Sequence, residues 1–393
     1  MKLNEEYEVK IIDDNHNGNG ICKIDDVPVF VRNAVALDIV KIKITKVTKK
    51  YAQGEIKTFI KPSKNRVVPI CKYYEKCGGC NLMHISYEKE LKTKEEYLEK
   101  LFKNKFQELV FLDRYNYRNK VTFHVKQGKM GFYDEKTNDL ICISSCDLLD
   151  REINELMVLL SKFDLSKISE IVIRKGDRVL LLYITGNIMR EDLEKLKNYK
   201  QEITVYQNDE LLYGKPFIIS TVGNIKYLIN HKAFFQVNSK CCNRLYEEVK
   251  KEVGSSKRLL DLYCGIGSIG LYLASICDSV VGVEINKESV KCARENIRLN
   301  NINNYEVIQG DASIVCDDFD TVVVDPPRSG LSKMVIKNLN EMNIDKLIYI
   351  SCNPSTLKRD IDLLTKYELV KVKGFNMFPC TKHVECVCVL KLK

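Results

Sequence analysis

The sequence predicts a multidomain α/β protein with a small OB-like β-barrel first, a central α+β antiparallel-sheet domain next and a Rossmann-like domain last. Short β-branched runs fill the first sixty residues, alternating apolar runs follow, and a strand–helix–strand rhythm begins at Lys257. A chain of 393 residues has room for about two or three domains. We therefore expect domains over residues 1–60, 61–225 and 226–393.

Composition indicates a cytoplasmic protein without a membrane partner. Hydrophobic residues make up 45% of the chain and charged residues 29%, which is typical of a globular protein in water. No apolar run approaches the roughly 20 residues of a membrane span, and the N-terminus lacks the apolar core of a signal peptide. Sixteen cysteines in a reducing compartment indicate metal binding or catalysis rather than disulfides. We expect a monomer, and the sequence identifies no protein partner.

The first domain carries a pattern typical of nucleic-acid binding. Short strands are predicted at Val9–Ile12, Pro28–Val31 and Ile39–Val47, and the clearest turn cluster is Asn15–Gly20. Such strands suit a small OB-like barrel. The stretch Val40–Arg66 holds nine Lys or Arg and one acid, interleaved with aromatic residues. This mixture favours contacts with a phosphate backbone and stacked bases, although a solvated strand face is the alternative.

Three cysteines lie close together after the barrel. Cys71, Cys77 and Cys80 have the spacing C-x5-C-x2-C, with two glycines between the last two. Thiolates at this spacing can hold zinc or an iron–sulfur cluster. Cys146 is the best candidate for a fourth ligand, and Cys142 is its competitor. The spacing differs from the C-x3-C-x2-C loop of radical enzymes, so we interpret the site as structural.

The middle of the chain is predicted to be an antiparallel sheet with helices at Arg151–Phe163 and Arg190–Tyr199. A helical pattern at Tyr87–Lys105 precedes it. Tyr117–Lys120 is basic and aromatic, which indicates either an RNA contact or a solvent-facing turn. The predicted strands are Val121–Val125, Met130–Tyr133, Leu140–Ile143, Ile171–Arg174, Val179–Thr185 and Ile203–Gln207.

The last domain opens with a nucleotide-binding pattern. A predicted strand ends in the glycine turn G-x-G-x-x-G that starts at Gly265, and Glu284 ends the next strand about twenty residues later. Asp261 before the turn and Glu284 after it favour a cationic sulfonium ligand, S-adenosylmethionine, over the pyrophosphate of NAD. Asp311 follows the third strand and is placed to meet the adenine amine, with a helix N-cap as the alternative.

Two later strands end in unusual motifs. Thr321–Val324 is followed by Asp325-Pro-Pro-Arg, and Lys346–Ile350 is followed by Ser-Cys352-Asn-Pro354. Ligands bind beyond the carboxyl ends of parallel strands, so Cys352 is placed to act on a substrate. Pro354 can open a helix whose N-terminus would lower the pKa of the thiol. The alternative is a buried cysteine that serves only packing.

Together, these motifs resemble the RNA (uracil-5-)-methyltransferase family. The resemblance rests on the cysteine spacing, the glycine turn with Glu284, Asp325-Pro-Pro-Arg328, and Ser-Cys352-Asn-Pro followed by His383-Val-Glu385. It spans essentially the whole chain and is strongest to the branch with an N-terminal TRAM domain and a [4Fe-4S] cluster. The resemblance implies S-adenosylmethionine-dependent methylation of C5 of a flipped-out uridine in 23S ribosomal RNA.

The resemblance also implies residue roles. Cys352 would be the nucleophile that adds to C6, and Glu385 the base that removes the C5 proton. The implied cofactor contacts are Gln236, Tyr263, Glu284 and Asp325, in addition to Gly265 and Asp311. The implied cluster ligands are Cys71, Cys77, Cys80 and Cys146. The helix at residues 86–104 would pack on the catalytic domain, and the barrel and the central sheet would hold RNA.

Three alternatives stay open at this point. A transfer RNA uridine could be the substrate of the same chemistry. The Asp325-Pro-Pro corner also resembles exocyclic-amine methyltransferases, which need no cysteine. A non-catalytic RNA-binding ribosome-assembly factor would explain the barrel and the cysteines, but it would leave the motifs at Cys352 and Glu385 without a purpose.

Overall fold

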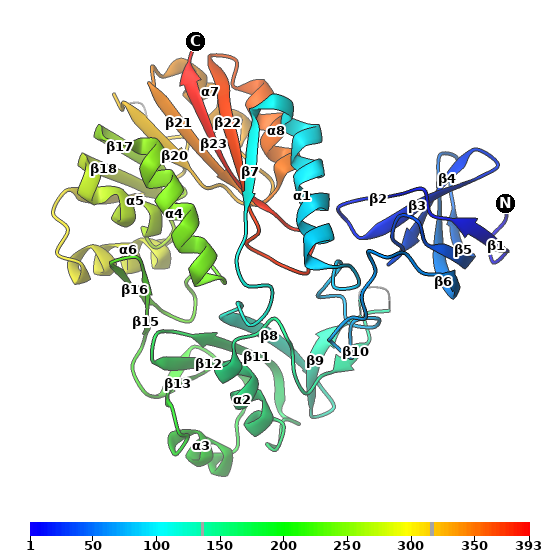
Figure 1. Ribbon diagram of the computed structural model, residues 1–393. Helices are drawn as coiled ribbons and strands as arrows, with labels where there is room; N and C mark the ends of the chain where they lie inside the picture. The colour runs from blue at the N-terminus through cyan, green and yellow to red at the C-terminus, as the bar shows by residue number, and fades with distance from the viewer. Residues whose placement is uncertain (135–136, 315–317) are drawn as a thin grey trace.

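The computed structural model describes residues 1–134, 137–314 and 318–393. Figure 1 shows a barrel at the N-terminus, a large sheet flanked by helices at the C-terminus, and a second sheet below it. The barrel lies to one side, with its β2–β3 hairpin directed toward helix α1. The barrel and the second sheet therefore both lie next to the domain that contains the large sheet.

The N-terminal domain is a six-stranded sheet around its own core, which confirms the predicted small barrel. Alternate residues of the fifth strand, Val40, Ile42 and Ile44, are fully buried, whereas Lys41 and Thr45 are exposed. The strand order is β1-β5-β6-β4-β3-β2, with bounds β1 Glu6–Lys10, β2 Asp13–Asp14, β3 Asn19–Ile24, β4 Val27–Arg32, β5 Ile39–Val47 and β6 Ala52–Lys61.

The C-terminal domain is built on an eight-stranded sheet with the order β19-β18-β17-β20-β21-β23-β22-β7. The five strands from β19 to β21 are parallel, and β23 runs antiparallel to both of its neighbours. The bounds are β17 Ser256–Leu262, β18 Cys277–Glu284, β19 Tyr305–Gln309, β20 Thr321–Val324, β21 Lys346–Ser351, β22 Tyr367–Phe375, β23 Glu385–Leu392 and β7 Phe106–Val110. This is the predicted Rossmann-like core.

Helices cover both faces of this sheet. Strand β21 shows the pattern, because Ile348 and Ile350 belong to one core and Leu347 and Tyr349 to the other. No helix in the described part of the chain is long and apolar enough to cross a membrane. One face carries α4 Ser239–Val253, α5 Ser268–Leu273 and α6 Lys287–Leu299, and the other carries α1 Tyr87–Phe102, α7 Lys333–Glu341 and α8 Pro354–Leu363.

Segments from earlier in the chain also pack on the C-terminal domain, and one of them, β7, is a strand of its sheet. Strand β7 pairs in parallel with β22, and α1 packs against α8 and β22. The hairpin of β15 Ile218–Val222 and β16 Ile225–Ile229 contacts α4, α5 and α6. The central domain is therefore interrupted by segments that complete the larger one.

The central sheet has seven strands in the order β10-β9-β8-β11-β12-β13-β14, and it is not wholly antiparallel as predicted. Strand β12 pairs with β13 in parallel, because helix α3 carries the chain back between them. The other pairs are antiparallel. The bounds are β8 Lys120–Lys126, β9 Lys129–Tyr133, β10 Leu140–Cys142, α2 Arg151–Leu160, β11 Ile168–Lys175, β12 Val179–Gly186, α3 Arg190–Lys197, β13 Glu202–Gln207 and β14 Glu210–Tyr213.

A buried ion pair fixes α1 against the loop of residues 376–383, which leads into β23. Lys94 and Glu90 are fully buried, and Lys94 Nζ lies 3.1 Å from Glu90 Oε1. Lys94 Nζ also donates to Asn376 Oδ1 at 2.7 Å and to the Phe378 carbonyl at 3.2 Å. Glu90 Oε1 accepts the backbone N–H of Cys380 at 2.9 Å. Burial lowers the pKa of Lys94, and the Glu90 carboxylate opposes this shift.

We predict that Lys94→Met destabilises the protein by about 3 kcal/mol, because it breaks a buried ion pair. The Glu90 carboxylate is then left with the Arg114 guanidinium, whose Nη2 lies 3.3 Å from Glu90 Oε2. The measurement is the free energy of unfolding from denaturant titration. Lys92→Ala is the matched control on the same helix, since its side chain is 69% exposed and faces only Glu96. The control should change stability by less than about 0.5 kcal/mol. Equal stability of the two variants would contradict the structural role of the pair.

Candidate active site

The predicted nucleophile and base meet at one edge of the large sheet. In the antiparallel pair of β21 and β23, Ser351 lies opposite Cys386. Cys352 directly follows Ser351, and Glu385 directly precedes Cys386, so the same register sets Cys352 against Glu385. Because β23 runs antiparallel, its first residue lies at the edge where the parallel strands end. Two residues distant in sequence therefore become neighbours.

The thiol of Cys352 is half-buried, and its pKa is raised to about 11. Burial is the main cause, and the Glu385 carboxyl adds to it. The nearby Arg328 guanidinium lowers the pKa and so opposes the shift. Pro354 does open helix α8, as predicted, with Asn353 as its N-cap. The expected lowering of the thiol pKa at this helix end is wrong, because burial outweighs it.

Two carboxyl groups lie near this thiol: that of Glu385, which is buried, and that of Asp325, which is half-buried. The pKa of Glu385 is raised to about 8, mainly by burial and also by the nearby Asp325 carboxyl, while Arg328 opposes the shift. Burial also raises the pKa of Asp325 to about 7. A carboxyl group with a pKa near neutrality can both give and take a proton, which suits acid–base chemistry. Arg328 is the one group in this set whose charge is fixed.

Arg328 is held in place by the start of helix α8. Its backbone carbonyl accepts hydrogen bonds from Asn353 Nδ2 and Thr356 Oγ1, both at 3.3 Å. Sequence reasoning included Arg328 in a motif but gave it no role. Its cation beside the thiol favours the thiolate form, which is the reactive form of cysteine.

The glycine turn forms a backbone cradle after β17. Tyr263, Gly265 and Gly267 all have positive φ, of 63°, 56° and 78° respectively. A tyrosine in this conformation is strained, and such strain is typical of functional sites. The Gly265 N–H donates to Glu284 Oε2 at 3.1 Å, and the Asn286 N–H donates to Oε1 at 2.7 Å. Each carboxylate oxygen can accept a further bond, so Glu284 can still bind ribose hydroxyls.

The other two predicted acids of this region differ in position. Asp311 is exposed beyond β19, and its Oδ1 accepts bonds from both the N–H and the hydroxyl of Ser313. Asp261 is fully buried, and its Oδ2 accepts bonds from the Gly270 N–H at 2.9 Å and the Tyr305 hydroxyl at 3.2 Å. Asp261 thus links the helix that follows the glycine turn to β19. Its side chain has a structural role, in place of the expected contact with the sulfonium.

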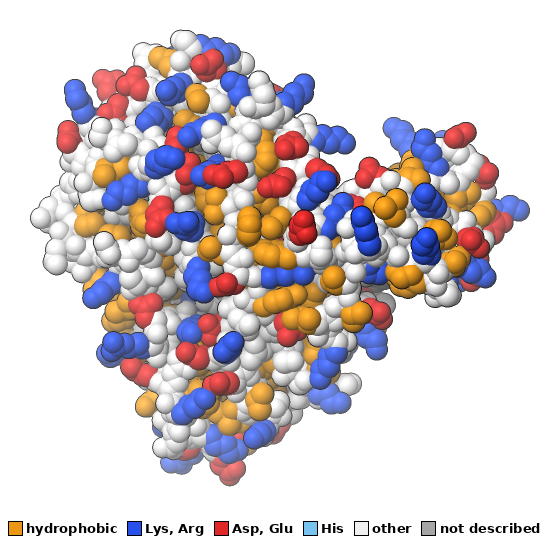
Figure 2. Space-filling model, viewed as in Figure 1, with side chains coloured by type: hydrophobic (Ala, Val, Ile, Leu, Met, Phe, Trp, Pro, Cys, Tyr) orange, Lys and Arg blue, Asp and Glu red, His pale blue; other side chains and the backbone are white. Residues whose placement is uncertain are grey.

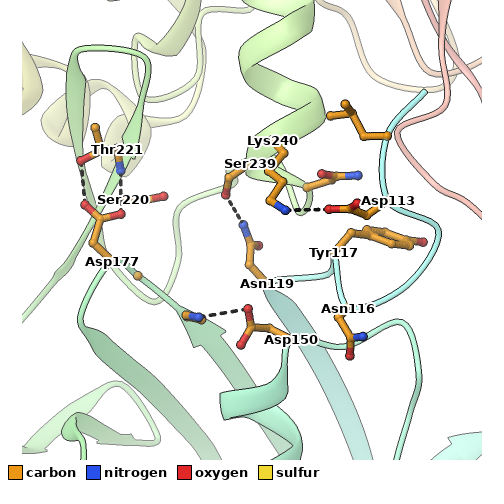
Figure 3. A pocket seen from close by; sticks show the side chains of 14 residues that line it. Asp113, Asn116, Tyr117, Asn119, Asp150, Asp177, Ser220, Thr221, Ser239 and Lys240 are labelled. Atoms are coloured by element: carbon orange, nitrogen blue, oxygen red, sulfur yellow. Dashed lines mark hydrogen bonds and ion pairs between the residues drawn. The ribbon is translucent and has the colours of Figure 1, made fainter. Parts of the chain in front are cut away.

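Gln236 lies on a segment that the central sheet holds in place. Asn119 Nδ2 donates to the Gln236 carbonyl at 3.2 Å and to Ser239 Oγ at 2.9 Å. Figure 3 shows the second bond beside a polar cavity of about 300 Å³ between the central sheet and α4. In the same cavity Lys240 pairs with Asp113 at 2.6 Å. Asn119, predicted to touch RNA or to form a turn, instead positions the Gln236 segment.

The four predicted cluster cysteines line one cavity of about 280 Å³, together with Arg118. Cys146 is among them, whereas its competitor Cys142 is exposed and does not line the cavity. Within residues 1–134, 137–314 and 318–393, no three His, Cys, Asp or Glu side chains converge closely enough to hold a metal ion. The thiols of Cys71, Cys77, Cys80 and Cys146 therefore surround a cavity and do not converge on one point.

The loop of residues 71–82, called the cysteine loop below, also contacts the loop of residues 376–383. The backbone N–H groups of Asn81 and Leu82 donate to the Cys380 carbonyl at 3.0 and 2.9 Å. The Tyr117 hydroxyl donates to the Pro379 carbonyl at 3.1 Å. These contacts join the predicted cluster site to the segment that ends at Glu385. Sequence reasoning could not find them, because they connect backbone groups that carry no motif.

A doubly wound parallel sheet with a glycine cradle and an acid at the end of the second strand defines a Rossmann-like protein that binds a nucleotide or nucleoside ligand, here with a cysteine at the sheet edge. Comparisons with known proteins identify the family to which this chain belongs. The family model "tRNA (Uracil-5-)-methyltransferase" matches residues 219–317 and 310–393, and the TRAM domain model matches residues 2–57. An uncharacterized RNA methyltransferase of Staphylococcus epidermidis is 32% identical, over 100% of this chain and 99% of its own length.

Two further relatives agree. An uncharacterized RNA methyltransferase of Staphylococcus aureus is 33% identical over 98% of this chain and 97% of its own. The solved structure of Pyrococcus abyssi tRNA (uracil-54, C5)-methyltransferase in complex with S-adenosyl-L-homocysteine is 25% identical, covers 98% of this chain and 100% of its own, and superposes with a TM-score of 0.83. The chain belongs to the RNA (uracil-5-)-methyltransferase family, whose members use S-adenosylmethionine, and it carries a TRAM domain.

We predict that Arg328→Gln lowers kcat/KM for methylation and moves the rising limb of its pH profile upward by about one pH unit. Removing the cation raises the pKa of the Cys352 thiol further, so less thiolate is present at any given pH. The measurement is kcat/KM between pH 6.5 and 9.5, which reports groups of the free enzyme. Lys358→Ala on helix α8 is the control and should leave the limb in place. Coincident profiles for Arg328→Gln and the wild type would contradict the assignment.

Proposed function

We propose that this chain methylates C5 of a specific uridine in 23S ribosomal RNA through a transient bond between Cys352 and C6. The observation that supports this proposal is the register of β21 and β23, which sets a thiol against a carboxyl group at the sheet edge. Exocyclic-amine methyltransfer would need neither group. A non-catalytic assembly factor would have no use for two carboxyl groups beside a cysteine.

The chemistry follows from the weak nucleophilicity of C5 in uracil. The Cys352 thiolate adds to C6, and the electron pair of the C5–C6 double bond moves to C5 as an enolate. C5 then attacks the sulfonium methyl group, and S-adenosylhomocysteine leaves. Glu385 removes the C5 proton, and the electrons of the C5–H bond re-form the double bond and expel the thiolate. Covalent catalysis of this kind replaces one difficult step by easier ones.

The protein's own groups prepare these steps. Arg328 supports the thiolate by lowering the pKa of the thiol. The raised pKa of Glu385, about 8, makes its carboxylate a stronger base than an ordinary glutamate, which suits removal of the C5 proton. S-adenosylmethionine would be held by Gln236, Tyr263, Gly265, Glu284, Asp311 and Asp325, and it supplies the methyl cation equivalent.

The RNA must present its target base outside a helix, because a stacked base cannot expose C6 to a thiol. The barrel offers exposed basic and aromatic side chains for the flanking strand. Figure 2 shows Lys and Arg side chains spread over the barrel among hydrophobic ones. Phe59 is 44% exposed, and the Arg66 guanidinium lies 4.4 Å from its ring centroid. Such pairs suit single-stranded RNA.

A transfer RNA substrate is the second candidate, because the Pyrococcus abyssi relative is described as a tRNA (uracil-54, C5)-methyltransferase. The feature that favours ribosomal RNA is the resemblance of the cysteine spacing to the branch that modifies large-subunit ribosomal RNA. The two substrates are distinguished by separating ribosomal and transfer RNA from cells with and without this protein and measuring 5-methyluridine in each by mass spectrometry. We expect the loss in 23S ribosomal RNA alone.

We also propose that Cys71, Cys77, Cys80 and Cys146 hold a [4Fe-4S] cluster. The support is their arrangement around a cavity, since a cluster occupies more space between its ligands than one zinc ion does. Burial raises the pKa of Cys146 to about 11, so an electropositive group would be needed to hold its thiolate. We assign the cluster a structural role.

The cysteine cavity predicts a spectroscopic result. Protein purified without oxygen should absorb near about 400 nm, as thiolate-ligated iron–sulfur clusters do. Cys146→Ala should lose this band, whereas the matched control Cys142→Ala should keep it. A colourless protein that contains one zinc ion, or loss of the band in Cys142→Ala, would contradict the assignment.

The mechanism predicts opposite effects of two substitutions. Cys352→Ala should abolish methylation without loss of RNA binding, because only the covalent step is removed. Glu385→Gln should accumulate a protein–RNA adduct on a denaturing gel, since elimination needs the base. Cys277→Ala is the control cysteine, and it should retain methylation because Cys277 lies at the start of β18. Methylation by Cys352→Ala would remove the nucleophile from the account.

A further inference from the structure

The N-terminal barrel reaches into the catalytic region. A cavity of about 200 Å³ opens beside Cys352, and its lining includes His16 and Asn17 from the barrel. Arg328 and Lys382 of the catalytic domain and Tyr97 of α1 line the same cavity. His16 and Asn17 belong to the turn of residues 15–20, called the barrel turn below. The wall of this cavity thus comes from both ends of the chain.

The barrel turn is rigid before any ligand arrives. Asn15 Oδ1 accepts the N–H groups of Asn17 and Asn19 at 3.0 and 3.2 Å. Gly18 has a φ of +79°, and a Cβ at this position would lie 2.2 Å from the Asn81 carbonyl oxygen. Only glycine allows this contact with the cysteine loop. The turn is therefore held in one conformation against the rest of the protein.

The same turn docks on helix α1. The rings of His16 and Tyr97 stack with centroids 3.7 Å apart and an interplanar angle of 14°. Asp14 pairs with Lys89 at 2.9 Å, and both side chains are largely buried. The Tyr97 hydroxyl lies 2.8 Å from Ser355 Oγ, in the first turn of the helix that follows Cys352. A continuous set of contacts joins the barrel turn to the catalytic cysteine.

The cavity attracts an anion. Arg328 and Lys382 line it, and none of the described residues that line it is Asp or Glu. His16 adds no charge, because burial and the nearby Lys382 lower its pKa to about 4. A neutral imidazole can stack and donate one hydrogen bond, as a nucleotide-binding side chain does. The combination of one stacked ring and two cations that line the cavity suits a phosphodiester with its sugar.

We propose that His16, Asn17 and Lys382 bind the ribose phosphodiester of the flipped target nucleotide in the cavity beside Cys352. The barrel is then a positioning element of the active site and not only a distant RNA-binding module. This inference rests on the proposed function, since it assumes that a single-stranded RNA nucleotide enters this cavity. It assigns the ligand as the ribose phosphodiester next to the reacting uracil.

The test uses the full-length protein and total RNA from cells that lack it. His16→Ala and His16→Phe should both lower kcat/KM for RNA roughly tenfold, because neither side chain can donate a hydrogen bond to the phosphodiester. His16→Phe keeps a ring that can stack on Tyr97, so it should keep the melting temperature of the wild type. Lys382→Ala should reduce the slope of log kcat/KM against log salt by about 0.7, the value for one phosphate contact on a single strand. The KM for S-adenosylmethionine should be unchanged in all three variants.

Lys337→Ala, on the exposed side of α7, is the control for Lys382→Ala and should leave the salt slope unchanged. An unchanged kcat/KM in His16→Ala, or an unchanged salt slope in Lys382→Ala, would overturn the inference. A loss in His16→Ala that His16→Phe restores would overturn it too, because the ring stacked on Tyr97 would then account for the effect and the role of His16 would be structural. Absence of methylation by the wild type would instead reject the proposed function.

Discussion

The antiparallel pairing of β21 with β23 is the constraint on which the catalytic region depends. A purely parallel sheet would place every strand start at the far edge, away from Cys352. Because β23 reverses direction between β21 and β22, Glu385 begins a strand at the edge where Cys352 ends one. The pairing also buries Glu385, and this burial raises its pKa to about 8. The antiparallel pairing of β23 thus sets both the position and the raised pKa of the Glu385 carboxyl group.

The loop of residues 376–383 carries this constraint to the rest of the molecule. Helix α1 holds it through Lys94 and Glu90, the cysteine loop holds it through the Cys380 carbonyl, and the central domain holds it through the Tyr117 hydroxyl. The barrel turn in its own right contacts both α1 and the cysteine loop. Domains that are separate in sequence therefore stabilise one short segment next to Glu385.

Much of the fold was readable from the sequence. Strand β20 matches its predicted range and β21 extends one residue beyond it, because each is a short apolar run that ends at a polar motif. Strand β7 was missed because Gln107 and Glu108 interrupt its apolar pattern, and its strand form depends on pairing with β22. The parallel pairing of β12 and β13 depends on the crossover through α3 and has no local signal. Likewise, no pattern around His16 predicts contact with a cavity beside Cys352, because that contact exists only after the domains pack.

The most direct test of the account is to identify the residue that bonds to the pyrimidine. A 23S ribosomal RNA transcript made with 5-fluorouridine would be incubated with the wild-type protein and S-adenosylmethionine, then digested and analysed by mass spectrometry. Fluorine at C5 cannot leave as a proton, so elimination stops and the adduct persists. We predict a peptide that contains Cys352 joined to a methylated fluorouridine nucleotide. An adduct on another residue, or methylated RNA with no adduct, would contradict the account.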